Sequence, residues 1–282
     1  MNQPGFKLSR RRFIGGVSLA AAGAFGYAHF LEAEWLQVCH VTVPLSNGAR
    51  SPLKLLHISD LHASAVVSLK FISRAVDAAL AFQPDLICIT GDFVTGTFDD
   101  PQQYTRILRR LSDAAPCFAV LGNHDGGAWA AVHGGYHDLQ RVSELLARGG
   151  ISLLHNDAKK FVAREWGLNV VGVGDAWAGP FDPGSAFQGV ETTAPTVLLS
   201  HNPDTKSKLL PHQWDLMLCG HTHGGQLRVP LVGTPFAPVE DKRYVEGLHR
   251  WNDRWLHITK GIGNVFGVRI NCRPDVSFLT LT

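Results

Sequence analysis

Five apolar runs in the sequence stop at side chains that can bind a metal ion. These runs are 55–59, before Asp60 and His62; 86–90, before Asp92; 117–121, before Asn123; 196–200, before His201; and 215–219, before His221 and His223. Apolar runs of this length indicate strands buried on both faces, and helical patterns between several of them predict a largely parallel sheet. Because ligands bind beyond the carboxyl ends of such strands, we expect these distant side chains to meet. The pattern predicts a metal site.

The composition indicates one large domain without a basic face. The chain has 282 residues, 45% of them hydrophobic, which is enough for a single core in a domain of about 250 residues. Its net charge is +2, but Lys7 and the arginines at 10–12 lie in an N-terminal leader that has no acidic residue. Without these four, 22 of the 26 Lys and Arg residues remain against 24 Asp and Glu residues, a net charge of −2. Nucleic-acid binders usually show a basic face, so we expect no nucleic-acid partner.

Residues 1–31 are expected to lie outside the folded domain, which we place at 32–282. Three arginines at 10–12 precede an aromatic residue and a Gly/Ala-rich apolar stretch. This order is typical of a secretory signal, and it resembles a twin-arginine (Tat) signal. We therefore expect export by the Tat machinery to the periplasm or to the outer face of the inner membrane. A small-residue site at 22–24 permits cleavage, but the stretch is also about long enough to span a bilayer, so release and membrane anchoring both stay open.

The five cysteines show no C-x-x-C spacing. Cys88, Cys117 and Cys219 fall within the predicted strands, where a free Cys behaves as a small apolar side chain. A disulfide between Cys39 and Cys272 stays open, because sequence alone does not show that two cysteines are close.

The first half of the domain alternates strands and helices, and the second half is mostly strands. Expected helices are 69–82, with an apolar stripe, 101–111, preceded by a good capping residue, and one that ends at 149–150. Further expected elements are an edge or antiparallel strand at 34–43, a Gly-rich loop at 126–135, an antiparallel ladder of 151–155, 160–163 and 168–173, a short helix near 206–210, and strands at 255–260 and 276–281. We therefore predict an α/β fold, a four-layer α-β-β-α sandwich of two mixed sheets.

The motifs D-x-H, G-D, G-N-H-D, H and G-H-x-H follow one another in this order, which is the signature of the calcineurin-like metallophosphoesterases. The chain resembles that superfamily over essentially all of residues 52–282. A single G-N-H-D or H-x-H would be weak evidence, but all five motifs occur, each after a predicted strand. The segment 214–244 is also similar to a bacterial phosphodiesterase branch whose relatives include exported or membrane-associated enzymes. The resemblance implies a shared fold, two metals and phosphodiester hydrolysis, and it leaves the natural substrate open.

The resemblance also implies how the metals are held. The first metal would be held by Asp60, His62 and His223 and the second by Asn123, His201 and His221, with Asp92 bridging both. Carboxylate, amide oxygen and imidazole donors without thiolates suit Mn, Fe or Zn, and we favour Mn among these. Glycines at 91, 122 and 220 would let the backbone turn sharply and approach the metals.

Two cations roughly 3.5–4 Å apart stabilise the attacking and leaving oxygens of an in-line displacement, and a bridging water that has lost its proton would attack phosphorus. The motifs contain no Ser or Cys nucleophile. By the resemblance, His124 contacts the phosphate or protonates the leaving oxygen, and Asp125 orients it; a structural role for His124 is the alternative. Among the other histidines, His57 is expected to pack in the core, and it stays open whether His133 and His137 line the cleft.

Four segments should border the cleft because each follows or adjoins a strand that ends in a predicted ligand: 93–99, 126–136, 175–189 and 224–247. The last two carry apolar and aromatic residues, and the last also carries Arg228 and Arg243. Apolar loops beside basic residues fit an amphiphilic phosphate, such as a phospholipid or a lipid-linked pyrophosphate, with Arg228 or Arg243 on the phosphate. The alternative is that these side chains pack the loops or face solvent.

The sequence thus predicts a monomeric, exported, metal-dependent phosphodiesterase that acts on a phospholipid or another phosphate of the cell envelope. One alternative is a hydrolase of UDP-2,3-diacylglucosamine-type pyrophosphates, although that substrate is cytoplasmic and the leader predicts export. A phosphomonoesterase is a second alternative, because the same metals serve both reactions. A non-catalytic binding module is a third, but such modules usually lose ligands or the motif histidine, and here none is missing.

Overall fold

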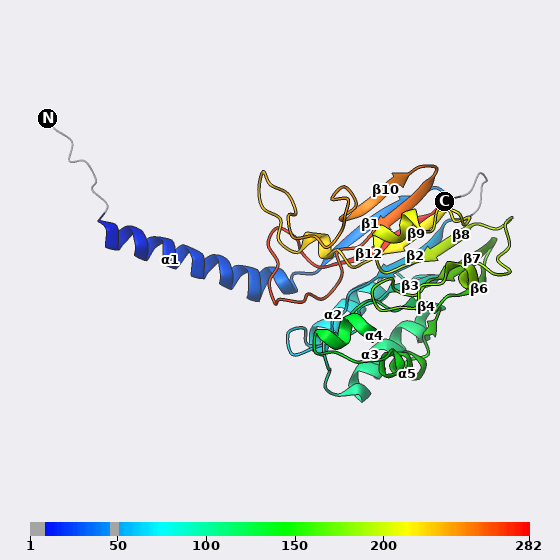
Figure 1. Cartoon of the computed structure of the whole chain (residues 1–282), viewed down its shortest axis with the longest axis horizontal. Coiled ribbons are helices and arrows are strands. Elements are labelled where there is room, and N and C mark those ends of the chain that lie inside the picture. The colour runs from blue at the N-terminus through cyan, green and yellow to red at the C-terminus, as the bar shows by residue number, and fades with distance from the viewer. Residues whose placement is uncertain (1–8, 46–50) are drawn as a thin grey trace.

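Two six-stranded sheets pack face to face at the centre of the molecule (Figure 1). The computed structural model describes residues 9–45 and 51–282. The first sheet has the strand order β1-β12-β2-β3-β4-β5, and the second has the order β10-β11-β9-β8-β7-β6. Each sheet contains both parallel and antiparallel neighbours. The predicted α/β architecture of two mixed sheets is therefore confirmed.

The strands that carry the predicted ligands lie near the middle of the two sheets. The first sheet consists of β1 (Gln37–Val43), β2 (Leu53–Ile58), β3 (Leu86–Thr90), β4 (Cys117–Val120), β5 (Ser152–Leu153) and β12 (Asp275–Leu281). The second consists of β6 (Asp157–Ala163), β7 (Trp166–Gly172), β8 (Thr196–Leu199), β9 (Leu216–Cys219), β10 (Gly247–Trp251) and β11 (Arg254–Ile258). Strands β2, β3 and β4 run parallel, as do β8 and β9, so within each sheet their carboxyl ends share one edge.

Three helices cover the outer face of the first sheet: α2 (Leu69–Leu80), α3 (Pro101–Ala114) and α5 (Gln140–Arg148). The side chains of Ser68 and Asp100 cap α2 and α3, each by accepting a backbone N–H from the first turn. The apolar stripe of α2, which includes Ile72 and Val76, is fully buried against the sheet. Burial of one such side chain contributes roughly 1.5–3 kcal/mol, so packing rather than propensity holds these helices in place.

The layer over the second sheet consists of short segments. It contains α6 (Pro183–Ala186) and a 3-10 helix (Pro203–Ser207), which pack with surrounding loops over β7, β8, β9 and β11. The short helix predicted near 206–210 thus begins earlier, at Pro203, where the Asn202 side chain accepts the N–H of Asp204. The fourth layer of the predicted sandwich is present but thin.

Two local predictions are wrong. In the expected ladder, only β6 and β7 form an antiparallel pair, whereas β5 pairs in parallel with β4 in the other sheet, because α5 brings the chain back as one more crossover. The expected loop at 126–135 contains a short helix, α4 (Gly127–Val132). Strand β1 is the predicted edge strand, and its pairing with β12 is parallel. Strand β10 was not predicted, because its half-exposed residues give no apolar run.

His57 is a core residue, as predicted. It is fully buried, and its Nε2 lies 2.9 Å from Thr90 Oγ1 while its Nδ1 lies 2.8 Å from Nδ1 of His257. The hydrogen bond between the two rings joins β2 of the first sheet to β11 of the second. Burial lowers the pKa of His257 to about 3, so both rings lie in the interface of the two sheets as neutral imidazoles.

All five cysteines are unpaired, so the Cys39–Cys272 disulfide does not form. The Cys39 thiol lies 3.5 Å from an oxygen of Asp275, and the Cys272 thiol lies 3.1 Å from the carbonyl oxygen of His223. Cys88, Cys117 and Cys219 are buried in the sheets, as predicted.

Helix α1 (Arg10–Gly26) projects away from the rest of the molecule (Figure 1). It continues through a π-helical turn (Tyr27–Leu31) and a 3-10 turn (Glu32–Glu34) into β1. Ala28 and Glu32 are already buried against the body, so packing begins a few residues before the predicted boundary at 32. By length and composition this helical segment is able to cross a membrane, a test that signal sequences also pass.

The buried imidazole pair makes stability depend on pH. The pKa of His257 is about 3 in the folded chain against about 6.5 in the unfolded chain, so protons bind the unfolded state first as the pH falls below 6.5. The stability linked to neutral His257 is therefore fully present above pH 6.5. As the pH falls to 5, the free energy of unfolding decreases by about 2 kcal/mol through this residue. The variant His257→Gln keeps a hydrogen-bond partner for His57 but cannot take up this proton. Between pH 7.5 and pH 5 we expect its free energy of unfolding to fall by about 2 kcal/mol less than that of the unmodified chain. Urea unfolding at both pH values measures this, and identical losses would contradict it.

Candidate metal centre

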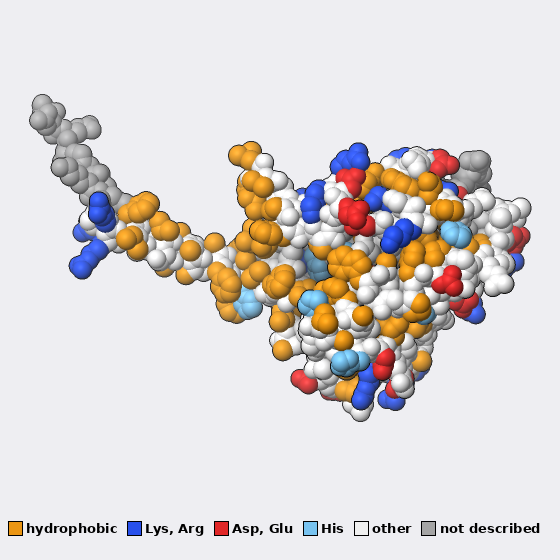
Figure 2. Space-filling view, viewed as in Figure 1, with side chains coloured by type: hydrophobic (Ala, Val, Ile, Leu, Met, Phe, Trp, Pro, Cys, Tyr) orange, Lys and Arg blue, Asp and Glu red, His pale blue; other side chains and the backbone are white. Residues whose placement is uncertain are grey.

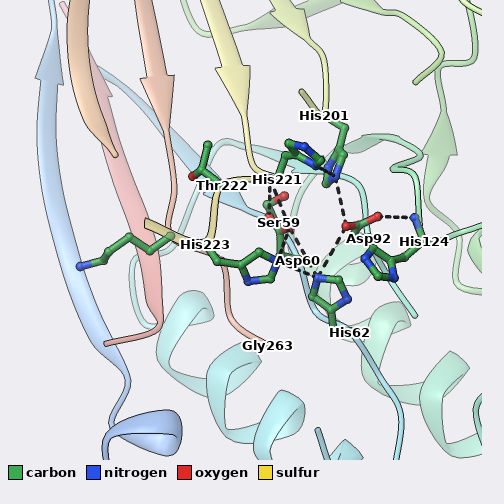
Figure 3. Close-up of polar contacts among 12 residues, drawn as sticks. Ser59, Asp60, His62, Asp92, His124, His201, His221, Thr222, His223 and Gly263 are labelled. Atoms are coloured by element: carbon green, nitrogen blue, oxygen red, sulfur yellow. Dashed lines mark hydrogen bonds and ion pairs between the residues drawn. The ribbon is translucent and has the colours of Figure 1, made fainter. Parts of the chain in front are cut away.

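The seven predicted ligands converge where the carboxyl ends of β2, β3, β4, β8 and β9 meet. Figure 3 shows six of them, Asp60, His62, Asp92, His201, His221 and His223, and Asn123 lines the same cavity. The first sheet supplies Asp60, His62, Asp92 and Asn123, and the second supplies His201, His221 and His223. The geometric prediction that these distant segments come together is therefore met. All seven side chains are buried.

The carboxylate and imidazole groups form two clusters that share Asp92. One cluster is Asp60, His62, Asp92 and His223, and the other is Asp92, His201 and His221, with the ligand atoms of each cluster within 4.8 Å of one another. Oδ2 of Asp92 lies 3.6 Å from His62 Nε2 and 3.1 Å from His201 Nε2. This carboxylate is thus positioned between the two clusters, the place that a bridging ligand requires.

Several nitrogen and oxygen atoms at the site either lack a hydrogen-bond partner or face another ring nitrogen. The Oδ1 of Asn123 and the Nε2 of His221 are buried without a hydrogen-bond partner. Nε2 of His62 lies only 3.0 Å from Nε2 of His223. Buried polar atoms normally find partners, and converging nitrogen and oxygen lone pairs are stabilised by a cation. The arrangement therefore fits divalent metal binding.

Hydrogen bonds to the other ring nitrogens fix two of the imidazoles. Nδ1 of His62 lies 2.5 Å from Thr95 Oγ1, and Nδ1 of His201 lies 2.6 Å from the carbonyl oxygen of Thr90. In each ring this leaves Nε2 directed at the cluster. Metal-ligating histidines are commonly held in this way, since the outer partner fixes both the tautomer and the ring orientation.

The backbone at the site is strained. Five of the seven ligands have a left-handed backbone: Asp60 (φ 52°), His62 (φ 49°), Asp92 (φ 54°), His221 (φ 68°) and His223 (φ 51°). Such residues cost on the order of 1–3 kcal/mol each and persist where the surrounding structure determines them. Here hydrogen bonds hold the backbone in this conformation. The Asp60 amide donates to the Gly91 carbonyl oxygen at 2.9 Å, and the His221 amide donates to the Asp60 carboxylate at 3.1 Å.

Two of the predicted glycines are required by close approach. A Cβ atom at position 220 would collide with the side chains of Ser59 and Asp60, and one at position 122 would collide with the Asp92 carboxylate. The glycines therefore let β9 and β4 bring their loops against the carboxylates, as the sequence predicted.

Electrostatics keeps the donors in forms that bind metals. Burial raises the pKa of Asp92, but the neighbouring imidazoles of His201 and His124 outweigh this effect, and the pKa lies well below its ordinary value. Burial lowers the pKa of His221 to about 3 and that of His223 well below its ordinary value. These imidazoles are neutral at pH 7, with lone pairs free. Burial lowers the pKa of His201, but Asp92 raises it well above its ordinary value, so a cation bound there would displace a proton.

His124 and Asp125 are both at the site, but not in the expected relation. The Asp125 carboxylate accepts backbone N–H groups from Gly122 (2.8 Å), Asp92 (2.9 Å), Phe93 (2.7 Å) and Val94 (3.2 Å). It therefore braces the two loops that carry Asp92 and Asn123, and no hydrogen bond described for it reaches the His124 ring. The ring of His124 instead packs edge-on against Trp129, with centroids 4.3 Å apart.

A cavity of about 620 Å³ opens beside the two clusters. All four segments that were predicted to border it contribute: Thr95 from the first, Trp129 and His133 from the second, Trp177 from the third, and Leu227, Phe236 and Pro238 from the fourth. His137 does not line it. Val265 and Phe266 also form part of the wall and were not predicted from the sequence. Their only signal was the stretch 261–263, which contains two glycines and begins three residues after the end of β11.

The two arginines assigned to the substrate lie elsewhere. Arg228 forms an ion pair with Glu246 and lines a separate surface hollow. Arg243 is exposed, and its guanidinium lies 2.6 Å from Asp241. Neither lines the 620 Å³ cavity, so their contact with the substrate phosphate stays a prediction that the geometry of the cavity does not support. Each side chain is held by an acidic neighbour within the same loop region.

Comparison with known proteins gives a consistent result. Residues 53–225 match the family model described as calcineurin-like phosphoesterase. Phosphodiesterase YaeI of Escherichia coli is 41% identical over 97% of this chain and 99% of its own length. The uncharacterized metallophosphoesterase YkuE of Bacillus subtilis is 27% identical over 98% of each chain. The UDP-2,3-diacylglucosamine pyrophosphatase LpxG of Chlamydia trachomatis is 25% identical over 90% of this chain and 91% of its own length.

The contact between Thr95 and His62 predicts an effect on metal affinity. Thr95→Val removes the oxygen that lies 2.5 Å from His62 Nδ1, so the ring loses its fixed orientation, and we expect affinity for Mn²⁺ to fall about 10–100-fold. Calorimetric titration measures it. Thr97→Val, at an exposed position two residues away, is the matched control and should bind as the unmodified chain does. Equal affinities in the two variants would show that Thr95 does not position His62.

Proposed function

The chain belongs to the calcineurin-like phosphoesterase family and is a hydrolase of phosphoric esters, and on this basis we propose that it is a phosphodiesterase that uses two divalent cations. The observation that carries the proposal is the position of Asp92, which lies in both donor clusters. A single cation would need only one of these clusters. Two clusters joined by a carboxylate suit the two-metal hydrolysis of phosphate esters.

In this proposal each cluster holds one cation. Asp60, His62 and His223 would hold the first and Asn123, His201 and His221 the second, with Asp92 shared between them. When bound, such a pair activates a water for in-line attack on phosphorus and neutralises charge on the phosphate oxygens. Oxygen and imidazole donors without thiolates suit Mn, Fe or Zn, and we take Mn as the first to test.

His124 is proposed to act on the substrate directly. It lines the cavity beside Asp92 and Asn123, and its backbone N–H donates to Asp92 Oδ1 at 2.8 Å. Burial lowers the pKa of its ring to about 4, so the imidazole is neutral at pH 7. A neutral ring can donate its N–H to a phosphate oxygen or to the leaving oxygen. This role needs no contact with Asp125.

The cavity wall favours a diester over a monoester. Among the described residues that line it there is no Lys or Arg, so a doubly charged monoester finds no cationic side chain beyond the cations themselves. The wall instead carries Trp129, Trp177, Leu227, Phe236 and Phe266. A diester has one negative charge and two organic groups, and these apolar side chains can contact the second group.

We take the substrate to be an amphiphilic phosphate of the cell envelope, such as a phospholipid. The apolar wall supports this assignment, and so does the leader, which we interpret as a Tat signal for export to the periplasm or to the outer face of the inner membrane. A lipid pyrophosphate is the second candidate. The likeness to a protein named UDP-2,3-diacylglucosamine pyrophosphatase favours this candidate. The apolar wall would also accommodate the acyl chains of such a substrate.

The reaction type is tested with two chromogenic substrates. We expect the Mn-loaded chain to hydrolyse bis(p-nitrophenyl) phosphate at least about tenfold faster than p-nitrophenyl phosphate, because only the diester places a second aryl group on the apolar wall. A chelator should abolish the activity and added Mn²⁺ should restore it. A preference for the monoester would favour a phosphomonoesterase, and no hydrolysis of either would favour a binding module.

The role of His124 is tested by substitution. His124→Ala should lower turnover of the diester at least about tenfold, because one hydrogen-bond donor to the reacting phosphate is lost, while metal content measured by mass spectrometry stays unchanged. His137→Ala removes an exposed histidine that does not line the cavity, and it should leave turnover unaltered. Full activity in His124→Ala would remove this residue from the mechanism.

A further inference from the structure

The base of α1 is fastened to the segment that forms one wall of the catalytic cavity. The backbone N–H of Arg269 donates to the carbonyl oxygen of Ala28 at 3.1 Å, and Nδ1 of His29 lies 2.6 Å from the carbonyl oxygen of Gly267. Phe266, directly before Gly267, lines the cavity. These hydrogen bonds therefore fix the orientation of this cavity wall relative to the base of α1.

The sequence of α1 has the order of a membrane-spanning segment. Residues 13–31 contain no Asp, Glu, Lys or Arg and extend about 28 Å as a helix, close to the thickness of a hydrocarbon core. Three arginines precede this run, while Tyr27 and Trp35, both partly exposed, lie at its other end. Tyr and Trp are enriched at the boundary between membrane and water. A bilayer around α1 would thus end at the base of the helix, beside the cavity wall.

Exposed apolar side chains gather on the same side of the body. We call them the apolar rim: Val66, Leu231, Val232, Phe236 and Phe266. Figure 2 shows hydrophobic atoms that continue from α1 onto the adjacent loops, with histidine atoms visible in the hollow beside them. Contiguous exposed apolar surface of this kind marks an interaction site.

The part of the rim at 229–233 is built to project. Two backbone hydrogen bonds between Val229 and Gly233, of 2.8 and 2.9 Å, close a tight turn. At its tip Leu231 is fully exposed and has a left-handed backbone with φ of 67°. Because this apolar tip is exposed, it does not pack against the rest of the described chain and is available for contact with another surface.

We propose that the apolar rim docks into the surface of the bilayer that holds α1, so that the cavity opens toward the lipid headgroups. Phe236 and Phe266 are 70% and 78% exposed and also line the cavity. They therefore form a continuous apolar path from the membrane to the two donor clusters. A lipid phosphodiester reaches the site along this path while its acyl chains stay in the bilayer. This inference rests on the proposed function for the identity of the bond that is cleaved, but not for the docking itself.

Docking is tested with fluorescent labels on the full chain, reconstituted in vesicles of phosphatidylethanolamine and phosphatidylglycerol with brominated acyl chains. A bimane label on Leu231→Cys should lose most of its fluorescence, because bromine quenches a fluorophore that enters the apolar region. The matched control is Val162→Cys on β6, an apolar position outside the rim that is also exposed (77%, against complete exposure of Leu231), and its label should stay bright. The unmodified chain gives the background from its native cysteines.

A pair of matched aspartate variants tests the consequence for catalysis. Val232→Asp changes a rim residue that does not line the cavity, and Val162→Asp makes the same change at the control position. With hexadecyl p-nitrophenyl phosphate in vesicles, we expect Val232→Asp to lower the rate about tenfold or more, because a charge opposes insertion of the rim. Soluble bis(p-nitrophenyl) phosphate should be hydrolysed at the unmodified rate, and Val162→Asp should change neither rate.

The possible outcomes separate the two proposals. If the Leu231 label is quenched but neither diester is cleaved, the docking stands and the proposed function fails. If the Leu231 label stays bright in vesicles, or if both labels are quenched equally, the docking is overturned whatever the activity. Disulfide crosslinking of Leu231→Cys between two chains would assign the rim to a second copy and would also overturn it.

Discussion

The burial of two carboxylates, Asp60 and Asp92, is the constraint on which the rest of the structure depends. Removing a carboxylate from water is expensive unless positive charge or hydrogen-bond donors replace the solvent. Four imidazoles surround the pair. Burial keeps His221 and His223 neutral, so these two rings supply lone pairs rather than charge, whereas Asp92 outweighs burial at His201 and raises its pKa well above its ordinary value. Divalent cations bound at the proposed sites would supply further positive charge. The backbone hydrogen bonds, together with such cations, would then maintain the strained backbone at five of the ligands in one geometry.

The two sheets meet that constraint jointly. β2, β3 and β4 deliver the carboxylates and Asn123 from one side, and β8 and β9 deliver three imidazoles from the other. Neither sheet holds both clusters alone, so correct packing of the sheets is a condition for the site. The hydrogen bond between His57 and His257 fixes β2 against β11, and Asp125 ties together the loops after β3 and β4. The site is therefore built on rigid elements, while the cavity wall is made of loops.

The sequence alone was sufficient to predict the fold class and the convergence of the seven donors, because each donor directly follows an apolar strand and the carboxyl ends of parallel strands share an edge. It was not sufficient for contacts that depend on how loops pack. Asp125 follows His124 in the chain but contacts backbone amides, and Arg228 is paired by Glu246; neither partner lies at a spacing that sequence reasoning can use. Phe266 was missed for the same reason, since it reaches the cavity only because the segment after β11 folds back beside the base of α1.

The donor clusters lie beside an apolar cavity, at the end of the molecule from which α1 emerges. The central claim is that Asp92 joins two cation sites into one. Titration of the metal-free chain with Mn²⁺, followed by calorimetry and by metal analysis after gel filtration, tests this claim most directly. The account predicts two equivalents of metal for the unmodified chain and weakened binding of both in Asp92→Asn. One equivalent in the unmodified chain, or loss of only one site in the variant, would contradict it.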